Sequence, residues 1–91
     1  MRIRWTSLAA VDLQSISDSL DEHHPQYRQP TLRKIYAGIR SLREAAYRGR
    51  SGRIEGTREL LFLPLPYVAV YSLHDDWIEI WRLYHTSQDR G

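Results

Sequence analysis

The sequence predicts an α+β fold in which two helices pack on one face of an antiparallel sheet. Apolar residues recur with a helical period between residues 9 and 46, and they alternate with a period of two from residue 58 onward. Only short turns separate the alternating segments, as in an antiparallel meander. A chain of 91 residues supports one hydrophobic core, so we expect a single domain over residues 1–91.

A short strand and a long helix are predicted at the N-terminus. Ile3 and Trp5 alternate with two arginines, which gives the strand one apolar face. Thr6 or Ser7 can cap the helix that follows. Four apolar residues then form a stripe at helical spacing: Ala9, Leu13, Ile16 and Leu20. We expect this helix to end at residues 23–25, because the residue before a proline is disfavoured in helical geometry.

Two prolines compete for the start of the second helix. Pro25 and Pro30 are both acceptable first-turn residues, but they lie too far apart to share one first turn. We favour a loose turn at residues 25–29 and a regular helix from Pro30 to about Tyr47. Its apolar face would contain Leu32, Ile35, Tyr36, Ile39, Leu42 and Ala46. A basic loop punctuated by glycines follows at residues 48–52.

Three strands are predicted for the rest of the chain, at residues 58–63, 67–73 and 77–84. Both faces of the last two strands are rich in apolar residues, so one face should pack on the helices while the other is partly solvated. Trp77 and Trp81 share one face of the last strand. We expect Trp81 in the core, and Trp77 either in the core or on an apolar surface that a partner covers.

The composition argues against several kinds of chemistry. The chain has no cysteine, which excludes disulfides and thiolate metal sites and fits a reducing compartment. Its histidines lack metal-ligand spacing, and its loop glycines precede a strand instead of opening a helix. We therefore expect no metal and no cofactor. The longest apolar run, residues 60–63, is too short to span a membrane, and the N-terminus lacks a signal-peptide core. We expect a cytoplasmic protein.

Positive charge is concentrated in the middle of the chain. Residues 28–58 carry nine bases and two acids, a net charge of +7, whereas the whole chain carries +2. Such a block suggests contact with nucleic acid, the ribosome or an acidic protein segment. Arg53 and Arg58 belong to the part of this block that leads into a strand. There an arginine could reach a phosphate or an acidic partner. The alternative is a solvated turn with no binding role. His85 closes the last strand, either as a general acid/base or as a structural hydrogen-bonding group.

These features, in this order, resemble the RelE/ParE superfamily of bacterial toxins from toxin–antitoxin systems, also labelled plasmid stabilisation proteins. The resemblance covers nearly the whole chain. Five segments carry it: Ile3-Arg4-Trp5-Thr6, "AAVDLQSI" at 9–16, "GRIEGTREL" at 52–60, "PYVAVY" at 66–71 and "IEIWRLYHTSQDR" at 78–90. It implies a toxin that forms a hetero-oligomer with a cognate antitoxin, whose helix or extended tail covers a cleft between the sheet and the helices.

The superfamily contains two activities, and the resemblance implies a different site for each. RelE-like members cut mRNA on the ribosome without metal, using basic residues that include an arginine on the middle strand of the meander. ParE-like members lack that set and resemble gyrase poisons. Here Val68 stands where the arginine is expected, and a valine cannot stabilise charge developing on a phosphate. The resemblance therefore favours a ParE-like inhibitor of DNA gyrase with no catalytic residue.

Two alternatives remain. The chain could be an mRNA endonuclease that uses Arg58 as a phosphate clamp and His85 as acid/base. It could also be a non-toxic corepressor that only binds the antitoxin. On the ParE-like interpretation, seven residues are candidates for partner binding: Arg48, Arg50, Arg53, Arg58, Trp77, His85 and Arg90.

Overall fold

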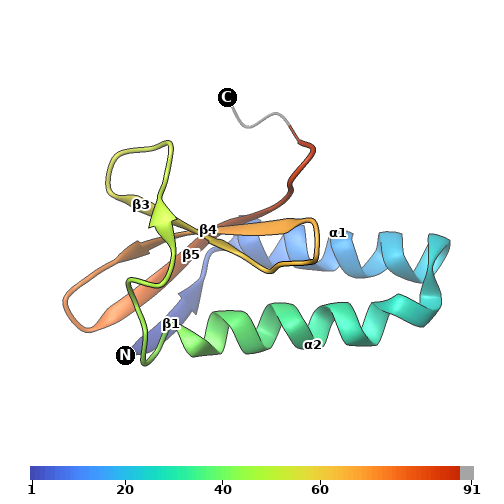
Figure 1. The fold of residues 1–91 in the computed structure, drawn as a ribbon, viewed down its shortest axis with the longest axis horizontal. Coiled ribbons are helices and arrows are strands. Elements are labelled where there is room, and N and C mark those ends of the chain that lie inside the picture. Colours follow the sequence, from blue (N-terminus) through green and yellow to red (C-terminus); the bar gives the residue numbers. More distant parts are fainter. Residues whose placement is uncertain (89–91) are drawn as a thin grey trace.

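The computed structural model describes residues 1–88 and contains a five-stranded sheet with two antiparallel helices packed against it (Figure 1). The elements in chain order are β1 (Arg2–Trp5), α1 (Ser7–His23), α2 (Pro25–Ser41), β2 (Arg50–Ser51), β3 (Thr57–Leu61), β4 (Tyr67–Leu73) and β5 (Trp77–His85). The expected α+β fold, with a short first strand, a helical hairpin and an antiparallel meander, is confirmed. Neither helix has the length and apolar character needed to cross a membrane.

The sheet has the strand order β1-β5-β4-β3-β2. β3, β4 and β5 form the antiparallel meander, and β1 joins it by pairing in parallel with β5, with Trp5 opposite Ile80. At the other edge, the two residues of β2 pair with Arg58 and Glu59 of β3. This small strand lies in the predicted basic loop, and two residues are too few to leave a periodic signal in the sequence.

The second helix begins at Pro25 and ends at Ser41, so the prediction of a helix from Pro30 to about Tyr47 was wrong at both ends. Pro25 occupies the first turn, and Pro30 lies inside the helix. Pro30 has no N–H for the carbonyl of Gln26, but Gln26 is exposed, so water can satisfy that carbonyl. The two prolines therefore share one helix without sharing its first turn.

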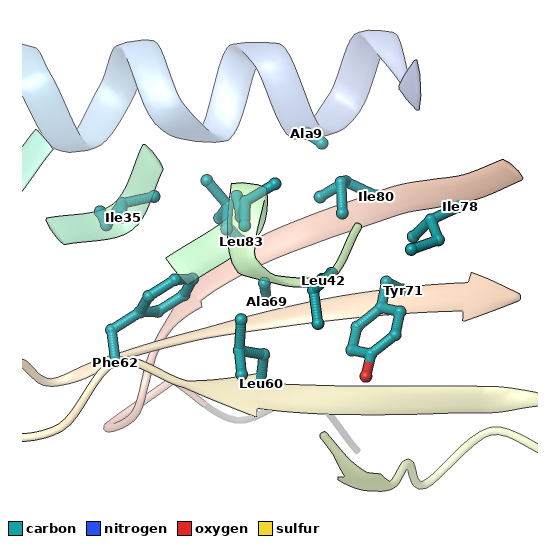
Figure 2. Close-up of a cluster of buried hydrophobic side chains, with 11 residues drawn as sticks. Ala9, Ile35, Leu42, Leu60, Phe62, Ala69, Tyr71, Ile78, Ile80 and Leu83 are labelled. Carbon is teal, nitrogen blue, oxygen red and sulfur yellow. The ribbon is translucent and has the colours of Figure 1, made fainter. Parts of the chain in front are cut away.

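The main core lies between the sheet and the two helices. Figure 2 shows its side chains converging from both layers, with Ala9 on α1, Ile35 on α2, and Ile78, Ile80 and others on the sheet. Tyr71 is the largest fully buried side chain. Its hydroxyl donates to the carbonyl of Ala46 (2.8 Å) and accepts from the N–H of Gly49 (2.9 Å). A Cβ at Gly49 would come within 2.6 Å of that hydroxyl, so only glycine fits there.

Two polar residues fasten the start of α1 to β5. Thr6, one of the two predicted caps, is the N-cap of α1, because its hydroxyl oxygen accepts from the N–H of Ala9 (3.0 Å). Its hydroxyl also donates to the carbonyl of Trp81 on β5 (2.7 Å). The carboxylate of Asp12 accepts from Nε (2.7 Å) and Nη2 (3.0 Å) of Arg82 and from the N–H of Leu83 (2.9 Å). A helix side chain thus satisfies the edge of β5 beyond the end of β1.

A register shift between β4 and β5 adds one residue to β5. Tyr71 pairs with Ile80 and Val70 with Arg82, so Trp81 is an extra residue without a partner on β4. Ile78 and Ile80 occupy the core face, which leaves Trp81 on the opposite face. There its indole N–H donates to the hydroxyl of Ser72 (2.9 Å). The expectation that Trp81 belongs to the core under the helices was therefore wrong.

We predict that Asp12→Ala lowers the free energy of unfolding by about 2 kcal/mol. The Asp12 side chain is only 15% exposed, and its loss removes a charged partner from Arg82 and leaves the N–H of Leu83 unpaired. The partly exposed Arg82 can be rehydrated, which keeps the cost below that of a fully buried pair. Urea denaturation monitored by circular dichroism measures it.

Asp18→Ala is the matched control on the same helix, because Asp18 is exposed. It should change the stability by less than about 0.5 kcal/mol. Equal stability of the two variants would show that the Asp12 contact does not hold α1 to the sheet.

Candidate functional site

Arg58 is bound to the backbone of the segment that follows α2. Its Nη2 donates to the carbonyls of Tyr47 (3.0 Å) and Gly49, and its guanidinium lies 5.2 Å from the centroid of the Tyr47 ring. The Nε atom is buried and has no hydrogen-bond partner within residues 1–88. Arg58 therefore ties β3 to the chain that returns from α2.

His85 lies at the end of β5 opposite Tyr67, and the two rings meet edge to face with centroids 5.5 Å apart. Its Nδ1 accepts from the N–H of Ser87 (3.1 Å). A backbone N–H can only donate, so a neutral His85 must carry its proton on Nε2. Burial raises the pKa of the Tyr67 phenol, which therefore stays neutral at physiological pH. Both residues line a shallow groove against α1.

The structure does not bring Arg58 and His85 together. Arg58 pairs with Tyr71 of β4, whereas His85 pairs with Tyr67 of the same strand. The four-residue offset corresponds to roughly 13 Å along the strand, and β4 lies between the two residues. One phosphodiester could not contact both side chains.

Residues 48–53, which we call the basic segment, contain three arginines that differ in how many contacts they make with other described residues. Arg48 donates from Nη1 to the hydroxyl of Ser41 (2.6 Å), and Arg50 pairs with the buried carboxylate of Glu59 (3.1 Å). Arg53 is exposed and has neither a hydrogen bond nor an ion pair with any other described residue. Arg53 is therefore the most available cation of the segment.

Trp77 lies outside the core and contacts cationic and aromatic neighbours. Its ring stacks on His74 at 3.9 Å between centroids, and the guanidinium of Arg4 lies 5.1 Å from its centroid. Trp77 is half-buried, so part of it remains open to a partner. Arg90, the last candidate, lies outside the described residues. Within residues 1–88, no three histidine, aspartate or glutamate side chains gather where they could hold a metal ion.

A groove beside α2 was missed by the sequence analysis. It has a volume of about 250 Å³, and its lining residues are Lys34, Ala37, Gly38, Arg48, Leu61, Phe62 and Leu63. The sequence does carry one signal for it. Leu63 lies next to a proline in a turn, where polar residues are usual, and its side chain is 75% exposed.

A family model and a known protein that match this chain are both described as toxins. Residues 3–90 match the family model described as the ParE toxin of the type II toxin–antitoxin system parDE. The chain is 33% identical over 87 residues to Y4kP of Sinorhizobium fredii (strain NBRC 101917 / NGR234), a protein named as a toxin. The alignment covers 96% of this chain and 90% of that protein.

Solved structures give the same result. A chain of the chromosomal ParDE system from P. aeruginosa is 26% identical, with a TM-score of 0.85 over 93% of this chain and 95% of that chain. YafQ from E. coli strain BL21(DE3) shares the fold at 18% identity, with a TM-score of 0.62 over 96% of each chain.

We predict that Arg58→Met lowers the free energy of unfolding by about 1 kcal/mol. The substitution removes two hydrogen bonds to carbonyls, each with a net value of about 1 kcal/mol, but it also removes the buried Nε that has no partner. Methionine keeps the packing of the arginine stem. Urea denaturation checks the value, with Arg33→Met as the exposed control. Unchanged stability together with lost toxicity would instead assign Arg58 to a binding surface.

Proposed function

Because this chain belongs to the ParE toxin family of type II toxin–antitoxin systems, we propose that its target is DNA gyrase and that a cognate antitoxin neutralises it by binding. On this proposal the protein inhibits a type II topoisomerase by occupying a surface of it. It carries out no chemistry of its own.

The separation of Arg58 from His85 carries the proposal. Cleavage of a phosphodiester needs an acid, a base and a group that stabilises charge, all around one phosphorus atom. Here Arg58 on β3 and His85 on β5 pair with residues of β4 that are four positions apart, and the guanidinium of Arg58 is already bonded to backbone carbonyls. Val68, where RelE-like members would carry an arginine, is only 1% exposed. The described residues thus favour an inhibitor over a nuclease.

The contact with gyrase would use positive charge at the edge of the sheet. Arg53 is free of other described partners, and Arg48 and Arg50 flank it on the same segment. Exposed cations speed the association of a protein with an acidic surface and favour one orientation of the two partners. We propose that this basic segment forms one part of the contact, and that the chain from His85 toward Arg90 forms another.

We predict that the purified protein blocks supercoiling of relaxed plasmid by gyrase and ATP, or traps linear DNA, and that added antitoxin restores activity. His85→Ala should weaken inhibition by at most about fivefold, the effect of removing one partly exposed contact, because on this proposal the ring takes part in binding and not in chemistry.

Two other outcomes would each point to a different function. Normal gyrase activity with mRNA cleavage on ribosomes, abolished by His85→Ala, would establish the nuclease. No effect on gyrase or mRNA, and no harm when the chain is produced alone, would establish the corepressor.

We predict that Arg53→Glu weakens gyrase inhibition about fivefold at low salt, which corresponds to about 1 kcal/mol for one exposed charge contact. The loss should shrink at high salt, because screening weakens interactions between exposed charges. Arg40→Glu on α2 makes the same change in charge at another exposed position. Inhibition curves at two salt concentrations measure both variants. Equal losses would mean that total charge matters, and no loss in Arg53→Glu would remove the basic segment from the contact.

A further inference from the structure

The face of the sheet opposite the helices has no helix over it within residues 1–88. Both helices lie on the side from which Ile80 and Leu83 project (Figure 2). Side chains alternate along a strand, so the residues between these core positions project to the other side, which we call the free face. On β5 the free face contains Trp77, Glu79, Trp81, Arg82 and Tyr84. This strand therefore presents three aromatic side chains away from the core.

The aromatic side chains at the centre of the free face rest on buried residues of β4. The indole N–H of Trp81 donates to the hydroxyl of Ser72 (2.9 Å), which is buried. Trp81 and Tyr84 border a hollow of about 60 Å³ together with the buried Val70 and with Ile54 from the turn between β2 and β3. Both aromatic side chains are half-buried, and Ile54 is 58% exposed. A partner that binds here would cover apolar surface that contacts within the sheet have already partly ordered.

The exposed charge beside this hollow is positive. Arg53 lines the hollow and is exposed. Glu59 lines it too, but this acid is buried and paired with Arg50 (3.1 Å), and Arg82 is paired with Asp12 (2.7 Å). Tryptophan, tyrosine and arginine carry much of the binding energy of protein interfaces, and an exposed cation favours an acidic partner. The free face thus has the composition of a surface that binds an acidic protein.

A nucleic acid fits the free face less well. The ring of Trp77 is already stacked on His74, with the centroids 3.9 Å apart, and the guanidinium of Arg4 lies 5.1 Å from its centroid. It therefore offers little open ring surface to a base. Glu79 lies on the same face between Trp77 and Trp81, where its negative charge would repel a phosphate backbone.

We propose that the free face around Trp81 and Tyr84 is the surface with which this protein binds its target, and that it contacts an acidic surface of the target protein. The inference rests on the proposed function for the identity of that target as gyrase. It extends the contact proposed there, because Arg53 belongs both to the basic segment and to the lining of the hollow. Aromatic side chains then supply most of the affinity, while the basic segment speeds association.

Supercoiling assays with gyrase and no antitoxin test the inference. Ile54→Glu and Tyr84→Ala should each weaken inhibition about tenfold, because the first adds a negative charge against an acidic partner and the second removes an aromatic contact. The loss in Tyr84→Ala should persist at high salt, since burial of apolar surface is not screened. Val11→Glu on α1 is the matched control: Val11 is 60% exposed, and its variant should inhibit within about twofold of the wild type.

Circular dichroism checks that each variant is folded, and Ile54→Glu keeps the test decisive if Tyr84→Ala unfolds, because Ile54 is exposed. Wild-type inhibition by Ile54→Glu would overturn the inference. So would an equal loss in Val11→Glu, which would indicate an effect of total charge. If Ile54→Glu instead weakens self-association, antitoxin binding or binding of a single-stranded 20-mer DNA and leaves inhibition unchanged, the free face belongs to that partner and the inference is overturned.

Growth of cells that produce the chain without antitoxin keeps the two proposals apart, because this measurement does not depend on which target is bound. Suppose that the wild type arrests growth but spares gyrase. Arrest that is lost in Ile54→Glu and kept in Val11→Glu would then defeat only the gyrase target and would support the free face as the target-binding surface. Arrest that persists in Ile54→Glu would defeat both proposals.

Discussion

The contact between Asp12 and β5 is the interaction on which the arrangement of this molecule depends. β1 pairs with β5 only as far as Ile80, and β5 continues to His85. Beyond that point Asp12 supplies the acceptor for the free strand edge and a counter-charge for Arg82. The hydrogen bond to the Asp12 carboxylate raises the pKa of Arg82, so the guanidinium keeps its positive charge. The helical hairpin is thereby fixed over the sheet, and α2 is held where the groove beside it can form.

Within residues 1–88, the candidate residues are spread across the sheet and do not gather at one place. The basic segment and Arg58 lie at the β2–β3 edge, whereas His85 lies at the end of β5. The Tyr71 hydroxyl on β4 and the Arg58 guanidinium on β3 both form hydrogen bonds to the backbone of the segment after α2. Separate charged and apolar surfaces on one frame would suit the two partners of the proposed function, an antitoxin and a target.

Periodicity in the sequence was sufficient to predict the fold class, the three meander strands and the Thr6 cap, because each of these depends on neighbours close in sequence. The features that were missed depend on distant ones. The pairing of Asp12 with Arg82 spans 70 residues, and a register shift against β4 decides that Leu83, and not Arg82, follows Ile80 on the core face. Arg58 looked available because no sequence pattern indicates that a side chain will bond to carbonyls across a turn. For the groove beside α2, the sequence indicated an exposed Leu63 but not its position next to the helix.

The parallel pairing of β1 with β5 has a consequence for the time at which the toxin appears in the cell. β1 and α1 are synthesised first, but their partners on β5 are synthesised 70 to 75 positions later. A nascent chain on the ribosome therefore cannot complete its sheet or place its hairpin until β5 has emerged from the exit tunnel. Every copy therefore passes through a stage during translation in which its fold is incomplete. That delay gives an antitoxin that is already present the chance to meet each new molecule as its fold is completed.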